Sequence, residues 1–85
     1  GSDVEESYIS IYNPMDKDCI TIEGLANIQK ANVRLYNIIG QEILSETLQT
    51  GLSTQNISTL GITTGIYVIK LQVDSTLISK KIIIN

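Results

Sequence analysis

The chain has 85 residues, of which 42% are apolar, and a formal net charge of -3 at pH 7. This length gives one domain that buries about 60 to 65% of the surface exposed by the unfolded chain, with no room for a second core. Asp3, Glu5 and Glu6 supply three of the nine acidic residues, so the rest of the chain is electrically neutral, which argues against nucleic acid as a partner.

Residues 1–7 are interpreted as lying outside the folded domain. Gly1-Ser2 is typical of a cloning scar, residues 3–7 are interpreted as an acidic linker remnant, and residues 8–85 as the folded domain. No apolar run reaches the roughly 18 residues needed to span a bilayer, and no signal-peptide pattern is present. The chain is therefore interpreted as a domain cut from a longer parent.

Alternation of apolar and polar residues predicts seven short strands and no helix. The first strand stops at Asn13-Pro14, a turn that favours an edge position. Gly40, at the end of a four-residue turn, suits a positive φ and a bulge. In chain order the strands are residues 8–12, 19–23, 32–36, 41–47 and 55–58, followed by two strands within residues 65–85.

The last two strands form a predicted hairpin that turns at Asp74-Ser75. The final run ends in two lysines and three isoleucines, with no alternation that would select its inward face. These lysines are either gatekeepers against edge-to-edge aggregation or part of a segment displayed to a partner. The first strand of the hairpin has clear faces, with Lys70 and Gln72 on one side and an apolar face made by Tyr67, Ile69, Leu71 and Val73.

Seven short strands with turn signals every eight to twelve residues predict an all-β, seven-stranded antiparallel immunoglobulin-like β-sandwich. Within that fold, Tyr67 stands where a sandwich often holds a tyrosine corner, with its hydroxyl bonded to upstream backbone.

The sequence contains few of the residues that commonly serve in catalysis. The sequence has no histidine and one cysteine, so a Ser/His/Asp triad, a Cys/His pair, a zinc site of the usual ligands and an internal disulfide cannot be assembled. Asp16 and Asp18 are interpreted as a solvated loop, with calcium as the minor alternative. We predict that the chain is not an enzyme and has no catalytic, cofactor-binding or metal-binding residues.

Four motifs in a fixed order resemble one family. Tyr12-Asn13-Pro14 is similar to an opening Tyr-Pro-Asn-Pro motif with one proline missing, and residues 33–43 resemble a strand, a turn and a Gly-Gln/Lys-x-Val/Ile return. Residues 60–70 and 80–84 complete the pattern. Together they resemble the type A C-terminal sorting domain of the type IX (Por) secretion system.

The resemblance implies a sorting signal. It predicts recognition by the type IX outer-membrane machinery, a cargo domain N-terminal to this one, and removal of the domain by a sortase-like cysteine protease when the cargo is anchored. The implied route is the periplasm and then the outer-membrane surface or the extracellular space. The residues that the resemblance implies in translocon recognition are Gly65, Tyr67, Lys80, Lys81, Ile82, Ile83 and Ile84.

Two alternatives remain open at this stage. One is an accessory adhesion or carbohydrate-binding β-sandwich module of a surface protein, for which Tyr8, Tyr12 and Tyr36 are the aromatic candidates beyond Tyr67. The other is a homodimer, because a hairpin that can lend a strand to a receptor can exchange it with a second copy.

Overall fold

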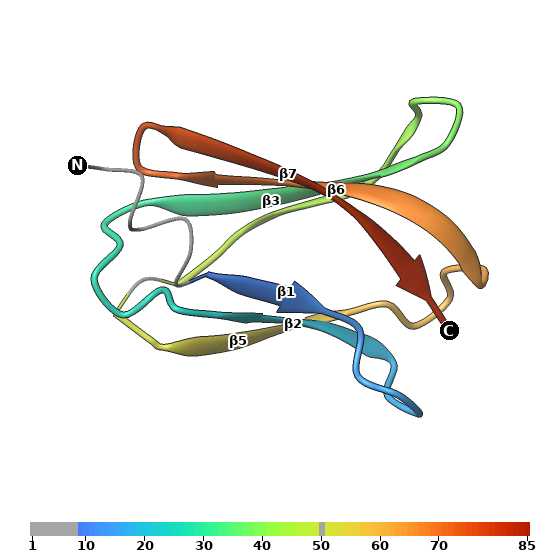
Figure 1. Cartoon of the computed structure of the whole chain (residues 1–85), viewed down its shortest axis with the longest axis horizontal. Coiled ribbons are helices and arrows are strands. Elements are labelled where there is room, and N and C mark those ends of the chain that lie inside the picture. The colour runs from blue at the N-terminus through green and yellow to red at the C-terminus, as the bar shows by residue number, and fades with distance from the viewer. Residues whose placement is uncertain (1–8, 50) are drawn as a thin grey trace.

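The computed structural model describes residues 9–49 and 51–85, and these form seven strands and no helix (Figure 1). One sheet has the strand order β1-β2-β5 and the other the order β4-β3-β6-β7. The predicted all-β, immunoglobulin-like sandwich is confirmed. The strands are β1 (Ser10–Tyr12), β2 (Cys19–Glu23), β3 (Ala31–Asn37), β4 (Glu42–Thr47), β5 (Thr54–Ser58), β6 (Gly65–Val73) and β7 (Thr76–Ile84).

The core lies between the two sheets and is mostly aliphatic. Val33 and Leu35 of β3 are fully buried, and they pair with Leu71 and Ile69 of β6, which are also fully buried. Residues at alternate positions of a strand share a face, so one face of each central strand supplies the core. The predicted apolar face of β6 is confirmed, because Tyr67 and Val73 are buried as well.

The turns follow from local side-chain chemistry. The Asn37 side-chain oxygen accepts hydrogen bonds from the backbone nitrogens of Ile39 and Gln41, and Gly40 has a φ of 92°. The β3–β4 register shifts between Leu35 and Tyr36, which confirms the predicted bulge beside this turn. The asparagine side chain therefore takes the place of backbone partners within the turn.

Asp74 joins the β6–β7 turn to a distant loop. Its φ is 50°, and its Oδ1 accepts hydrogen bonds from the backbone nitrogens of Gln29 and Lys30 at 3.1 and 2.9 Å. The Asp74 nitrogen in turn donates to the Lys30 carbonyl at 2.8 Å. The predicted reversal at Asp74-Ser75 is confirmed, and it also fixes the loop that leads into β3.

A few boundaries differ from the predicted ones. The strand predicted from residue 41 begins at Glu42, because both backbone groups of Gln41 bond to Asn37 within the turn. The predicted connection at 25–31 contains a residue of the core, because Leu25 is fully buried. The predicted first strand extends to Tyr8, which lies outside the described residues, as does the interpretation of residues 1–7 as scar and linker.

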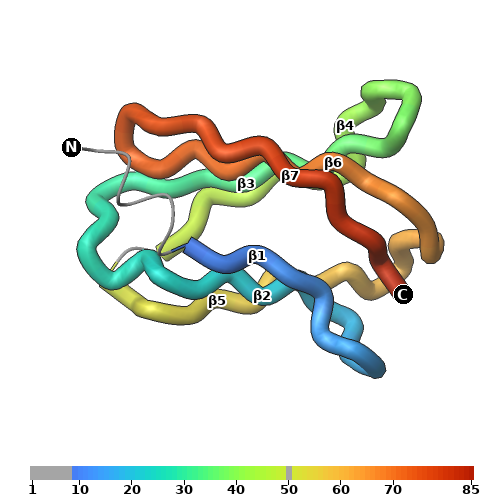
Figure 2. Tube along the Cα trace, in the orientation of Figure 1, coloured from blue at the N-terminus to red at the C-terminus, as the bar shows by residue number. Residues whose placement is uncertain are grey.

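Four strands lie at the edges of the sheets, namely β1 and β5 of one sheet and β4 and β7 of the other. β7 and β1 run along the same open side of the sandwich (Figure 2), where Lys80 of β7 bonds to Ile11 of β1. In the part of the chain that the structure describes, no helix is long and apolar enough to cross a membrane.

Candidate recognition surface on the terminal strand

The terminal strand β7 has two distinct faces, which settles the orientation that alternation could not select. β7 pairs along its whole length with β6, from Thr76 opposite Val73 to Ile84 opposite Gly65. Ile82 and Ile84 are 6% and 2% exposed and point toward the other sheet, whereas Ile83 is 61% exposed. The five predicted residues of the terminal segment are therefore divided between two faces, with Lys80, Ile82 and Ile84 inward and Lys81 and Ile83 outward.

Lys80 points inward at the open side of the sandwich. It takes the strand position between the buried residues Ile78 and Ile82, and although the residue as a whole is exposed, its ammonium donates a hydrogen bond to the Ile11 carbonyl oxygen at 2.8 Å. A long cationic side chain can cover apolar surface with its stem while its charged end reaches a polar partner. Lys80 thus connects the edge strands of the two sheets, and an inward-pointing charge also discourages pairing at an edge.

Asn13 holds the end of β7 to the turn that follows β1. Its Nδ2 donates to the Cys19 carbonyl oxygen at 2.6 Å and more weakly to the Lys17 carbonyl oxygen. Its Oδ1 accepts hydrogen bonds from the backbone nitrogen and the Nδ2 of Asn85, at 2.8 and 3.2 Å. Sequence reasoning used Asn13 only as a turn residue and missed this contact, which depends on the arrangement of both sheets.

Gly65 and Tyr67 are cross-strand partners of the terminal isoleucines, because Gly65 lies opposite Ile84 and Tyr67 opposite Ile82. Tyr67 is 8% exposed, and its hydroxyl donates to the Thr63 carbonyl oxygen at 2.6 Å, which confirms the tyrosine corner. Gly65 has a φ of 154°, and a Cβ there would meet no atom closer than 3.8 Å, so its backbone angle is the constraint. Tyr67 therefore supports the hairpin from the core, and Gly65 permits the backbone angle at the start of β6.

The exposed residues of the predicted site are Lys80, at the open side of the sandwich, and Lys81 and Ile83, on the outer face of the four-stranded sheet. Ile83 lies opposite Ile66, and Lys81 lies opposite Val68. Ile66 is 49% exposed, so two isoleucines and a lysine form a mixed apolar and cationic surface. We call Ile66, Lys81 and Ile83 the outer strip. Adjacent exposed apolar side chains, such as Ile66 and Ile83, are candidates for contact with a protein partner.

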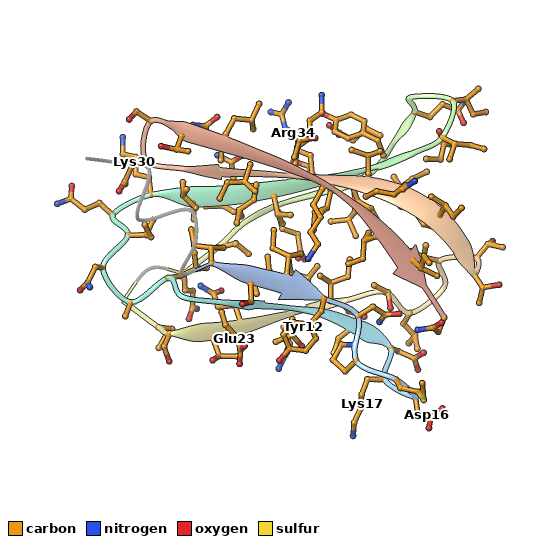
Figure 3. The ribbon with its side chains drawn as sticks, in the orientation of Figure 1. Tyr12, Asp16, Lys17, Glu23, Lys30 and Arg34 are labelled. Atoms are coloured by element: carbon orange, nitrogen blue, oxygen red, sulfur yellow. The ribbon has the colours of Figure 1, made fainter. Side chains whose placement is uncertain are left out.

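The tyrosines do not assemble into one sugar platform. Tyr12 is 41% exposed and lies on the outer side of the three-stranded sheet near Glu23 (Figure 3), whereas Tyr36 lies on the outer side of the other sheet. Desolvation and the neighbouring Glu23 carboxylate raise the pKa of Tyr12. Tyr67 is in the core and Tyr8 is outside the described residues, so the carbohydrate-binding alternative gains no support from the described tyrosines.

The acidic residues of the described chain are not grouped for metal binding. Within residues 9–49 and 51–85, no group of three or more cysteine, aspartate or glutamate side chains is arranged to hold a metal ion. Cys19 is half-buried, and its Sγ lies 3.9 Å from the Thr21 hydroxyl.

These features define an immunoglobulin-like domain whose last strand is bound to its first through side chains. Residues 10–85 match the sequence profile of a family described as "Secretion system C-terminal sorting domain". The match begins at the first residue of β1 and covers nearly the whole chain, and the chain therefore belongs to this family of type IX secretion sorting domains. A comparison with curated proteins found no match. Membership makes the domain a signal for export to the cell surface or the extracellular space.

Proposed function

We propose that this domain is a non-catalytic signal that the type IX outer-membrane machinery recognises through the β6–β7 hairpin. The observation that carries the proposal is the family match over residues 10–85, which includes the whole hairpin. In this proposal the predicted recognition residues divide into two roles. Lys81 and Ile83 contact the machinery, and the inward residues hold the strand that presents them.

The exposure of the residues supports this division. Tyr67, Ile82 and Ile84 are each less than a tenth exposed, so a partner can reach them only by displacing β7. The outer strip is open to a partner without any such change.

The remaining steps of the proposed route concern the parent protein. We propose that a cargo domain lies N-terminal to the sandwich, and that the parent passes through the periplasm to the outer-membrane surface. A sortase-like cysteine protease then removes residues 8–85 by cutting in or before residues 1–7. Peptide segments between folded domains are the usual targets of proteolysis.

The test is a secretion assay in a host that has type IX machinery. Residues 3–85 are fused to a fluorescent protein with an inner-membrane signal peptide, and export is compared for the intact chain and the double variant Lys81→Gln, Ile83→Asn. Leu77→Asn is the matched control, because Leu77 lies on the same strand and outer face and is 56% exposed. The double variant should remain folded in the periplasm, and the control should be exported.

Each part of the proposal can fail separately. If the intact fusion stays in the periplasm, the sorting function is wrong for this chain, and an accessory module becomes the better interpretation. If the double variant is exported as well as the control, the outer strip is not the recognition surface. Mass spectrometry of the exported fusion tests cleavage, since an exported protein that retains residues 8–85 would contradict removal by a protease.

A further inference from the structure

A row of polar side chains crosses the outer face of the four-stranded sheet, away from the outer strip. Arg34 of β3 lies directly opposite Lys70 of β6. Ser45 of β4 is the partner of Arg34 on its other side, and Ser79 of β7 is the partner of Lys70. Figure 3 shows the Arg34 side chain directed away from the core. Two cations therefore stand side by side at the centre of the sheet, between two hydroxyl groups.

This arrangement is unfavourable for the isolated fold. Like charges directly opposite each other on neighbouring strands destabilise a sheet. The Glu42 carboxylate lies 3.8 Å from the Arg34 Nε, but both side chains are about half exposed, so this ion pair is weak. The Lys70 ammonium lies 5.3 Å from the centre of the Tyr36 ring, a contact that attracts the cation without neutralising it. One positive charge remains uncompensated at this row.

The two cations also border a hollow. A shallow depression of about 340 Å³ is lined by Asn32, Arg34, Tyr36, Lys70, Gln72 and Leu77. A second depression of similar volume shares Tyr36 and Lys70 with the first and extends to Ile38 and Gly40 at the tip of the β3–β4 turn. The cationic centre thus has an apolar side chain at each end, because Leu77 is 56% and Ile38 80% exposed.

The chemistry of the lining favours an acidic peptide over a sugar. The Lys70 ammonium occupies one face of the Tyr36 ring, so that face is not free for stacking on a sugar. Arginine offers a planar set of donors that matches a carboxylate, and lysine adds a point charge beside it. The exposed Leu77 and Ile38 side chains would contact apolar residues on either side of the carboxylates.

We propose that this face binds an extended peptide segment of a partner protein with closely spaced carboxylates, held by Arg34 and Lys70. The bound carboxylates would relieve the repulsion between the two cations. The chain itself contains a segment of this chemistry, Asp3-Val4-Glu5-Glu6. Arg34 and Lys70 are not part of the outer strip, so the failure of this proposal can be distinguished from the failure of the proposed function.

The test is an NMR titration of the ¹⁵N-labelled chain at low ionic strength. The probe is a synthetic peptide with the sequence of residues 3–7, and the control peptide carries Asn and Gln in place of its acids. We expect the acidic peptide alone to shift the amide signals of Arg34, Lys70 and their neighbours. Arg34→Gln and Lys70→Gln should each weaken binding about five- to tenfold, whereas Lys17→Gln, in the exposed β1–β2 turn, should not.

A variant of the full chain with Asp3→Asn, Glu5→Gln and Glu6→Gln identifies the source of the peptide. If the chain's own segment occupies the site, these changes alone will shift the Arg34 and Lys70 signals and strengthen binding of the added peptide. If the peptide comes from another protein, the variant and the parent chain will bind the probe equally. The second result supports the proposal, and the first overturns it, because the face would then hold the chain's own acidic segment and not a partner.

Three further results would overturn the proposal. One is a titration in which the acidic and control peptides give the same shifts. Another is binding of a polyuronate oligosaccharide without binding of the peptide, which would assign the face to acidic glycans. The third is a result in which Lys70→Gln lowers the melting temperature and no peptide binds, which would make the role of Lys70 purely structural. The proposal instead expects an unchanged or higher melting temperature for this variant, because the repulsion between Arg34 and Lys70 is removed.

Discussion

Asn13 and Asn85 are joined by two hydrogen bonds, although they lie 72 positions apart in the chain. The Asn13 oxygen accepts both bonds, and its nitrogen bonds at the same time to the Cys19 carbonyl oxygen. Lys80 makes a second connection on the same side of the sandwich, to Ile11. The first and last strands belong to different sheets, so these side chains supply the connection that a backbone ladder does not.

Replacing Asn13 should loosen the end of β7. Asn13→Ala removes the partner of Asn85 and of the Cys19 carbonyl oxygen, and we expect a loss of about 1 to 2 kcal/mol in the free energy of unfolding. Urea denaturation measures this loss, and hydrogen exchange at residues 82–85 should accelerate. Asn27→Ala, in the exposed loop before β3, is the control and should change stability by less than about 0.5 kcal/mol. Equal effects of the two substitutions would contradict a role for the Asn13 contact.

Lys80 should limit self-association as well as join the sheets. Lys80→Met keeps the length of the side chain but removes its charge and its bond to the Ile11 carbonyl, so we expect sedimentation to show dimers that grow with concentration. Lys81→Met on the outer face of the same strand is the matched control. If both variants stay monomeric, β7 is protected from pairing by something other than the inward charge.

The Tyr67 hydroxyl should stabilise the corner that precedes β6. Tyr67→Phe keeps the buried ring and removes the hydrogen bond to the Thr63 carbonyl oxygen, for an expected loss of about 1 to 2 kcal/mol in unfolding free energy. Tyr36→Phe, on the outer face, provides the comparison. A Tyr67→Phe variant as stable as the parent chain would mean that the corner is held by packing alone.

Most strands and turns could be predicted from local sequence patterns. The features that the prediction missed depend on contacts between the two sheets. Cys19–Glu23 was predicted with its observed bounds, because clear alternation and a following glycine are both local signals. The face of β7 could not be predicted, because Lys80 and Lys81 are chemically alike and only Lys80 meets a partner from the other sheet. Leu25 was predicted to lie in a connection, because its burial arises only when the two sheets are assembled. The residues of the predicted site are therefore close together on β6 and β7, but they lie on both faces of the sheet.

Tyr12 should titrate above its usual range, because desolvation and the nearby Glu23 carboxylate raise its pKa above 10.0. The unfolded chain then loses the tyrosine proton at a lower pH than the folded chain does. The stability contribution of this group is therefore fully present below pH 10 and is lost as the pH rises through the folded pKa. Ultraviolet absorbance of tyrosinate measures the shift, and Glu23→Gln should bring the Tyr12 pKa back toward 10.0. An unchanged value would mean that Glu23 does not contribute to the shift.

Ile82 and Ile83 are neighbours with opposite exposure, so substituting each in turn can distinguish an effect on folding from an effect on the proposed recognition. Ile82→Ala should cost about 2 to 4 kcal/mol in unfolding free energy, because Ile82 is 6% exposed and its truncation leaves a cavity. Ile83→Ala, at a position 61% exposed, should cost less than about 1 kcal/mol. If the export machinery reads the folded surface, Ile83→Ala will reduce export without reducing stability. If instead Ile82→Ala is exported better than the parent chain, the machinery binds β7 after it leaves the sandwich, and the outer strip would not be the contact surface.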